Sequence, residues 1–267
     1  MINLETVKAL RALRLPGMAR ELESQLEEPQ RYKDLSFEDR LTLLVDSESV
    51  SRRKNTISRR IREAKFSEST ACIEAIEYHE DRKLNRSLIT KLATCAYIQE
   101  NHHVILKGAT GAGKSYIANA LGVAACRKLY KVRYVSLPDL LNEYAVAKAL
   151  NEQKKVKLAY SKFDLLIIDE WLLRPLPESE SYDLLELIEA CSKKGAIILC
   201  TQYDIDDWYF RIDCDREITD EDDTSAVAEG ILDRLIHNKY MIDVKGRISM
   251  RKRHAFAESE GEVADNE

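Results

Sequence analysis

The sequence lacks several features that would mark particular classes of protein. It contains no apolar run long enough to cross a bilayer, and its N-terminus lacks the apolar core of a signal peptide. Its six cysteines are scattered, without C-x-x-C spacing, and several lie in apolar runs, so buried free thiols are expected rather than disulfides or zinc ligands. The formal net charge of −5 excludes a uniformly basic surface. These absences predict a cytoplasmic protein with no membrane partner, in which any nucleic-acid contact comes from a local patch.

The composition that remains is that of a globular protein with a sizeable core. Hydrophobic residues make up 45% of the chain and charged residues 33%. A chain of 267 residues can hold one α/β domain and a smaller module.

The most informative stretch is Gly108–Ser115, which reads Gly-Ala-Thr-Gly-Ala-Gly-Lys-Ser. It follows the apolar run 104–106 and precedes a helical pattern over 116–126, which is the context of a phosphate-binding loop. Glycines let successive backbone N–H groups face phosphate oxygens, and the helix N-terminus adds partial positive charge. A chance glycine-rich turn is the alternative, but it does not account for the order strand, loop, helix. We therefore expect ATP or GTP to bind here.

The residues expected to contact the nucleotide form one continuous segment. They are Gly108, Ala109, Thr110, Gly111, Ala112, Gly113, Lys114, Ser115 and Tyr116. Within it, Lys114 is expected to reach the β- and γ-phosphates and the Ser115 hydroxyl to ligate Mg²⁺.

The N-terminal third of the sequence has a helical pattern. Pro16-Gly17 interrupts a first apolar face, Ser36 with Asp39 predicts the start of a long helix, and 88–98 predicts another helix. The sequence predicts a helical domain over 1–85, a nucleotide-binding domain over 86–253 and a disordered acidic tail over 254–267.

A local excess of positive charge lies inside the predicted long helix. Between Arg52 and Lys65 there are seven basic side chains and one acidic side chain. The basic residues are Arg52, Arg53, Lys54, Arg59, Arg60, Arg62 and Lys65. A solvated helix face is the plain interpretation, whereas the functional one is contact with DNA phosphates without reading of sequence.

From residue 103 onward, short apolar strands alternate with helices. Strands are predicted at 104–106, 132–135, 163–168, 195–200 and 241–244, and helices at 116–126, 140–150, 181–192 and 226–236. This alternation predicts an α/β fold with a doubly wound parallel sheet. The acidic stretch 213–223 lacks periodicity and is expected to be a surface loop.

Polar residues at the ends of two buried strands complete the candidate site. Asp169 and Glu170 follow the apolar run 165–168, where carboxylates would face the crevice used by ligands. Asp169 is expected to hold Mg²⁺ and Glu170 to polarise the attacking water. Thr201-Gln202 could place a polar group near the γ-phosphate, although a polar pair in a turn is the alternative.

Two arginines near the C-terminus are candidates for phosphate contact. Arg234 lies on a predicted helix and could act on the nucleotide of a neighbouring subunit, or simply pair with Asp233. Arg251 could contact phosphates within its own chain, or belong to a basic surface cluster.

Across about residues 3–253, the chain resembles the IstB family, helper ATPases of insertion-sequence transposition related to DnaC-type helicase loaders within the AAA+ class. The resemblance is carried by segments outside the phosphate-binding loop as well as by the loop. They are Leu13–Met18, Leu35–Leu41, Arg59–Phe66, Trp171, Thr201–Tyr203 with Trp208, and Ile231–Asn238. Two departures are an extra residue in Gly246–Arg251, which shifts the register of Arg251, and the acidic stretch 213–223.

The resemblance implies an AAA+ ATPase with an all-helical N-terminal domain that interacts with DNA. It implies ATP and Mg²⁺ as cofactors, and double-stranded DNA, a transposase and further copies of the chain as partners. Carried over by motif, Asp169 and Glu170 form the second Walker element, Thr201 or Gln202 is the first sensor, Arg234 the inter-subunit arginine and Arg251 the second sensor.

Three other functions stay open at this point. A replicative helicase loader would need an N-terminal segment that binds a helicase, whereas the basic run favours DNA. A P-loop kinase for a small metabolite would need an acceptor site, of which the sequence shows no signature. A nucleotide-dependent binding module with little turnover is the third.

Overall fold

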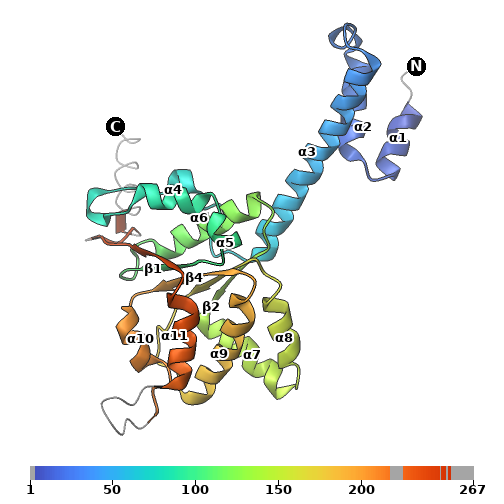
Figure 1. Ribbon diagram of the computed structural model, residues 1–267. Helices are drawn as coiled ribbons and strands as arrows, with labels where there is room; N and C mark the ends of the chain where they lie inside the picture. The colour runs from blue at the N-terminus through green and yellow to red at the C-terminus, as the bar shows by residue number, and fades with distance from the viewer. Residues whose placement is uncertain (1–3, 217–224, 247, 251, 254–267) are drawn as a thin grey trace, which may run out of the picture. The chain divides into compact units, whose positions relative to one another are not determined.

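A computed structural model describes residues 4–216, 225–246, 248–250 and 252–253 (Figure 1). Its internal contacts divide the chain into two compact units, Met1–Arg59 and Arg60–Glu267. Residues 60–85 thus pack with the unit that contains the sheet, 26 residues ahead of the predicted limit at 85/86. The functional limits of the domains stay a prediction.

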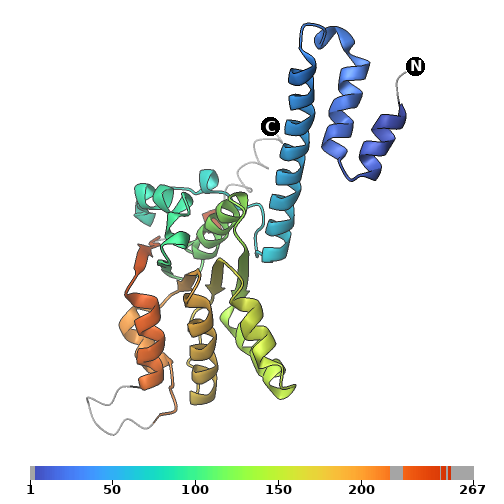
Figure 2. The same ribbon diagram turned by 45° about the vertical axis from the view of Figure 1, so that its right-hand side comes forward.

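The first unit is helical, with α1 (Leu4–Ala12), α2 (Pro16–Glu27), the short 3-10 helix η1 (Pro29–Arg31) and the first part of α3 (Phe37–Ala64). Figure 2 shows α2 running alongside α3. The Glu48 carboxylate on α3 accepts the Gly17 N–H at 2.7 Å, which satisfies one of the free donors at the start of α2. Pro16 stands in the first turn of α2. Proline has no backbone N–H, and at this position such a group would have no partner within the helix.

Helix α3 begins where the sequence predicts. The Asp39 N–H donates to Ser36 Oγ at 3.1 Å, and the Ser36 N–H donates to Asp39 Oδ2 at 3.3 Å. This reciprocal pair is a capping box with aspartate in place of glutamate. The helix ends at Ala64, and Lys65 follows in a left-handed conformation with φ +56°.

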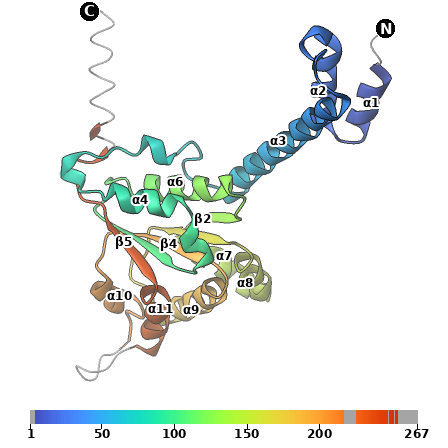
Figure 3. The same cartoon turned by 45° about the horizontal axis from the view of Figure 1, so that its top comes forward.

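The second unit contains a five-stranded parallel sheet with the strand order β2-β3-β4-β1-β5. Its strands are β1 (His103–Lys107), β2 (Val132–Ser136), β3 (Leu165–Asp169), β4 (Ala196–Thr201) and β5 (Lys239–Asp243). Helices cover both faces of the sheet (Figure 3). The predicted α/β fold with a parallel sheet is therefore confirmed.

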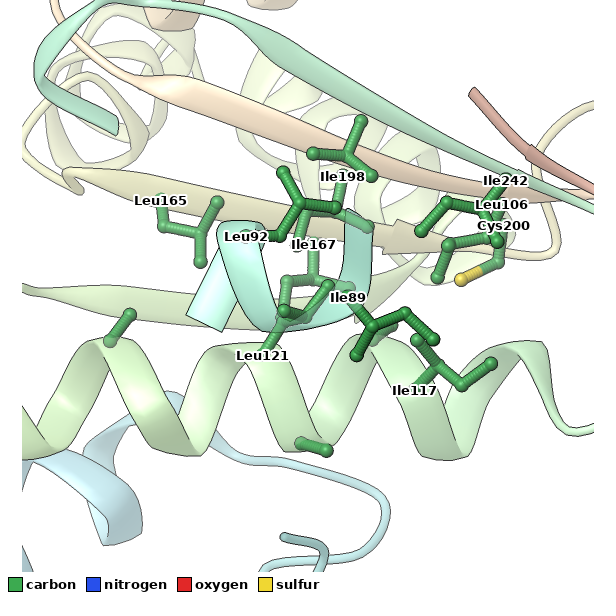
Figure 4. Close-up of a cluster of buried hydrophobic side chains, with 14 of the residues drawn as sticks. Ile89, Leu92, Leu106, Ile117, Leu121, Leu165, Ile167, Ile198, Cys200 and Ile242 are labelled. Carbon is green, nitrogen blue, oxygen red and sulfur yellow. The ribbon is translucent and has the colours of Figure 1, made fainter. Parts of the chain in front are cut away.

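The described helices of this unit are the end of α3, α4 (Arg86–Ala93), α5 (Ala96–Gln99), α6 (Lys114–Arg127), α7 (Leu137–Ala149), α8 (Gln153–Tyr160), α9 (Glu178–Ser192), α10 (Ile205–Arg211), α11 (Ala226–Ile236) and the 3-10 turns η2 (Ile73–Ala75) and η3 (Glu80–Arg82). Side chains alternate between the two faces of β1. Leu106 packs in the cluster under α4 and α6, whereas Ile105 packs in the cluster under α7, α9 and α11. Figure 4 shows Leu121 of α6 and Ile167 of β3 pointing toward each other in the first cluster. This buried sheet fixes the strand ends that carry the site.

The prediction of a single helix over 88–98 is wrong in one respect, since this range contains two helices, α4 and α5. Cys95 separates them with φ +61°, and burial of Tyr97 and Ile98 fixes the second segment apart from the first. Tertiary packing overrides the local helical pattern here. All six cysteines are free thiols, as predicted, and four of them are buried. Of the helices that the structure describes, none combines the length and apolar character needed to span a bilayer.

Candidate nucleotide-binding site

The loop after β1 has the backbone that its glycines allow. Gly111 and Gly113 take φ values of +79° and +91°, a region that residues with a side chain rarely occupy. Gly113 is the N-cap of α6, so the loop passes directly into the helix N-terminus. At its start, the Gly108 N–H donates to the Thr201 carbonyl of β4 at 3.1 Å. The loop therefore presents a helix N-terminus at the carboxyl edge of the sheet, where anions are stabilised.

Lys114 curls back over this loop. Its Nζ donates to the carbonyls of Gly108 and Ala109 at 2.8 and 2.9 Å. Burial lowers its pKa, while the nearby Cys200 thiol and Asp169 carboxylate act in the opposite direction. Lys114 and Asp169, which are far apart in sequence, are thus close enough to interact electrostatically.

Two contacts that sequence reasoning missed brace the other side of the loop. Arg82 is 4% exposed, and its guanidinium donates through Nη2 to the Ala112 carbonyl at 2.9 Å. The Met250 N–H donates to the Gly111 carbonyl at 2.9 Å. No local pattern announces either contact, because each joins segments distant in sequence. Tyr116, the last predicted contact residue, has its side chain against the buried cluster and the Cys72 backbone.

Asp169 is the last residue of β3, and its carboxylate is held from two sides. Oδ1 accepts the Glu170 N–H at 2.8 Å, and Oδ2 accepts the Tyr134 hydroxyl of β2 at 2.6 Å. Glu170 itself is exposed, and its backbone is left-handed with φ +55°. A non-glycine residue in that conformation stores strain of about 1–3 kcal/mol, and such strain concentrates at functional sites. Tyr134 is a further residue that the sequence did not reveal.

The side chains of Thr201 and Gln202 have different surroundings. Thr201 is 2% exposed, and its hydroxyl is used within the fold, where it donates to the Trp171 carbonyl at 3.2 Å and accepts the Tyr203 N–H at 3.1 Å. Gln202 is exposed, and its Oε1 accepts the Thr110 hydroxyl of the phosphate-binding loop at 3.3 Å. Of the two side chains, that of Gln202 reaches the loop.

Arg234 is not brought to the loop of its own chain. It lies on α11, where its Nη1 donates to the Gly230 carbonyl at 2.6 Å. Its backbone faces the imidazole of His103, the first residue of β1, whereas the loop follows the last residue of that strand. Arg251 lies outside the described residues, as do most of the acidic stretch and the predicted tail.

The seven predicted DNA-binding residues differ in their surroundings. Arg52 is committed to the first unit, since its Nε donates to Glu48 Oε1 at 2.7 Å. Arg60 is half-buried, and its Nε finds no hydrogen-bond partner within the described residues. The remaining five are exposed and form no ion pair with any described residue: Arg53, Lys54, Arg59, Arg62 and Lys65. These five are available for phosphate contact.

The oxygen ligands near Lys114 fit Mg²⁺ better than a softer metal. Ser115 follows Lys114 at the start of α6, and Asp169 supplies one carboxylate. In the described part of the chain, no three His, Cys, Asp or Glu side chains gather as a metal-binding group. A single carboxylate and a hydroxyl suit an ion that completes its coordination with water and substrate phosphates.

Comparisons with known proteins identify the family of the chain. Residues 8–257 match the family model described as IstB-like ATP binding protein. The chain is 37% identical over 202 residues to the insertion sequence IS1162 ATP-binding protein of Pseudomonas fluorescens, covering 76% of this chain and 87% of that one. It is 31% identical over 252 residues to an insertion-sequence ATP-binding protein of Sinorhizobium fredii, covering 94% of this chain and 98% of that one.

Solved structures show the same fold at low identity. AMPPCP-bound DnaA from Aquifex aeolicus superposes with a TM-score of 0.53 at 15% identity, covering 70% of this chain and 54% of that chain. DnaI superposes with a TM-score of 0.50 at 16% identity, covering 66% of this chain and 89% of that chain. These likenesses show the same fold, a parallel sheet flanked by helices. The family match over almost the whole sequence, with these relatives, shows that the chain belongs to the IstB-like ATP-binding protein family.

Proposed function

We propose that this chain is an ATP-dependent DNA-binding ATPase that assembles on target double-stranded DNA and assists the transposase of the same insertion element. The observation that carries the proposal is the convergence of Lys114 and Asp169 at the carboxyl edge of the sheet, in a chain of the IstB-like family. The relatives named above are ATP-binding proteins of insertion sequences, which supports the same context.

The residues divide the chemistry among them. Backbone N–H groups of the loop and the Lys114 ammonium bind and orient the triphosphate. Ser115 and Asp169 would hold Mg²⁺, which supplies charge neutralisation at the β- and γ-phosphates when it is bound. The exposed Glu170 carboxylate accepts a proton from the attacking water, and Gln202 orients groups at the γ-phosphate from beside Thr110.

Arg234 acts across a subunit boundary in this proposal. Its position at the amino end of β1 supports that assignment, because its own loop lies at the other end of the strand. ATP binding would then favour assembly, and assembly would complete each site. Arg251 keeps its proposed role as second sensor on the family resemblance alone.

An ATPase assay with and without duplex DNA tests the proposal on three proteins. The wild type should hydrolyse ATP faster with duplex DNA. Glu170→Gln should bind ATP and DNA but turn over slowly, since the acceptor of the water proton is lost. Lys114→Ala should lose nucleotide-dependent DNA binding, because the triphosphate loses its cationic partner.

The alternatives give different results in the same assay. Phosphate transfer to a metabolite without a DNA requirement would support a kinase, and ATP-dependent DNA binding with negligible turnover would support a binding module. Normal assembly of Lys114→Ala on DNA would show that nucleotide is incidental and would overturn the proposal.

A further inference from the structure

The turn that follows Asp169, residues 170–173, holds two residues in a backbone conformation that residues with a side chain rarely adopt. Glu170 and Leu172 have φ values of +55° and +53°. Leu172 is fully buried, and the Leu173 N–H donates to the Glu170 carbonyl at 3.1 Å, which closes the turn. Such a conformation persists only where the surrounding structure holds it. The groups that hold this turn therefore set the place of the Glu170 carboxylate.

The Arg211 side chain holds the turn through two hydrogen bonds. Arg211 is the last residue of α10, and its Nε and Nη2 donate to the carbonyls of Leu172 and Leu173, each at 2.8 Å. A planar guanidinium that bonds two adjacent carbonyls fixes their direction as well as their distance. The Arg211 backbone is tied to the same loop, since its carbonyl accepts the Leu176 N–H at 2.7 Å. Side chain and main chain of Arg211 are thus both bonded to the segment that carries Glu170.

The same guanidinium connects the turn to the phosphate-binding loop. Its Cζ lies 3.7 Å from the centroid of the Tyr203 ring, within the range of a cation–π contact. The Gln202 amide donates to the Tyr203 hydroxyl at 3.1 Å, and its Oε1 accepts the Thr110 hydroxyl at 3.3 Å. Arg211 therefore lies between the turn that carries Glu170 and the side chain that reaches the loop.

The contacts of Arg211 differ from those of a second arginine in the same loop. Arg174 is exposed, and its Nη2 donates to the Glu180 carboxylate at 3.0 Å, as is usual for a surface arginine. Arg211 is half-buried and forms no ion pair with any described residue. Its donors are spent on the backbone of the turn instead.

We propose that Arg211 is a positioning residue for ATP hydrolysis, which holds the strained turn of Glu170 at a fixed place relative to Gln202 and the phosphate-binding loop. It acts through the turn and through Tyr203, and it touches no reacting atom. The inference rests on the proposed function, because it requires Glu170 to accept the proton of the attacking water.

Arg211→Lys is the first test variant. It keeps the positive charge, but an ammonium group cannot bond two carbonyls as a planar guanidinium does. We expect kcat for ATP hydrolysis to fall by about tenfold, the scale of one hydrogen bond to a charged group. The affinity for a non-hydrolysable ATP analogue should stay at the wild-type value, because Lys114 and the loop backbone are unchanged. Arg174→Lys is the matched control, and it should leave both quantities unchanged.

A second background shows whether the loss passes through Glu170. In Glu170→Gln the proton acceptor is already absent, so adding Arg211→Lys should lower kcat further by less than about twofold. Amide hydrogen exchange of segment 170–174 gives a measurement that needs no turnover. Exchange there should be faster in Arg211→Lys than in the wild type, and unchanged in Arg174→Lys.

Tyr203→Leu is a second test variant, which leaves the Arg211 side chain intact and removes the ring on which its guanidinium stacks. We expect kcat to fall by about threefold, the scale of one cation–π contact near the surface. A wild-type kcat in both Arg211→Lys and Tyr203→Leu, or an equal loss from Arg211→Lys with and without the Glu170 carboxylate, would overturn the inference. A wild type that hydrolyses no ATP would instead overturn the proposed function itself.

Discussion

Arg82 keeps a guanidinium almost fully buried beside the phosphate-binding loop. Burial lowers its pKa, and the nearby Glu77 carboxylate acts in the opposite direction. Its two terminal nitrogens donate to the backbone carbonyls of Glu77 and Ala112. Because the Ala112 carbonyl is held by Arg82, the loop N–H groups are kept in one orientation before a ligand arrives.

Arg82→Met should therefore weaken nucleotide binding. The substitution keeps the approximate length of the side chain and removes the guanidinium group. The affinity for a fluorescent ATP analogue should therefore fall by about tenfold. Arg86→Met is the control, since Arg86 is exposed and its guanidinium lies 5.1 Å from the Tyr78 ring rather than on the loop. A folded Arg82→Met protein with wild-type affinity would show that the loop needs no such brace.

His103 is a buried base at the start of β1. Its Nδ1 accepts the Ile197 N–H at 3.1 Å, and burial lowers its pKa from 6.5 to about 4. The folded protein therefore keeps this imidazole neutral at pH values where the unfolded chain protonates it.

The stability of the protein should decrease as the pH falls from about 6.5 toward 4. In that window the unfolded state binds more protons, so the free energy of unfolding rises with pH, by roughly 3 kcal/mol over the full range. Urea unfolding at several pH values should show this slope, and His103→Gln should reduce it.

At the scale of elements, α3 illustrates what the sequence can and cannot predict. Ser36 and Asp39 predict its start correctly, since capping depends on neighbours three residues apart. Its attachment through Phe66 to Gly122 is not predictable in the same way, because the two residues meet only after α6 packs on the sheet. Local signals specify helix ends, and long-range packing specifies where the helices lie.

The exposed basic residues of α3 within the first unit should contribute to the affinity for DNA. Replacing Arg53, Lys54 and Arg59 with alanine should weaken duplex binding uniformly across sequences. The slope of log affinity against log salt should fall by about 0.9 for each phosphate contact removed. These three are preferable to Arg52 and Arg60, whose loss would also disturb packing.

A second triple variant separates this effect from net charge. Lys154, Lys162 and Lys194 are exposed and form no ion pair with a described residue. Their replacement with alanine removes three positive charges, as in the first triple variant, but away from α3. An equal fall in the salt slope for both triples would move the DNA surface away from α3.

The site shows the same division between local and long-range information. The phosphate-binding loop and the Asp169-Glu170 pair were predictable, because each is a short pattern at a strand end. Arg82 and Tyr134 were not, since they contact loop and carboxylate from 30 and 35 residues away, in segments without a motif. The short helices α8 and α10 were also missed, because their patterns span too few residues to show a period.

At the scale of the whole molecule, the parallel sheet separates two parts of the proposed machinery. The loop follows Lys107, and the Arg234 backbone lies by His103, about 13 Å away along β1 at the rise of a parallel strand. Both the loop and Asp169 stand at the carboxyl edge. Arg234 at the amino edge is therefore distant from the loop of its own chain, as its proposed action on a neighbouring copy requires.

Mixing two slowly hydrolysing variants tests that arrangement. Arg234→Ala should bind ATP and hydrolyse it slowly, and Glu170→Gln should do the same for a different reason. Mixed assemblies should recover part of the wild-type turnover, because a Glu170→Gln subunit still offers Arg234 to an intact site on its neighbour. Mixtures no more active than the separate proteins would place Arg234 within its own chain or outside the reaction.

The two tryptophans of the sequence, Trp171 and Trp208, are fully buried against each other, with ring centroids 5.5 Å apart. Trp171 directly follows Glu170, and its backbone N–H donates to the Cys200 carbonyl of β4. The tryptophan emission of the protein therefore originates beside the acidic end of β3. Changes there can be followed optically, in the unlabelled chain and in real time.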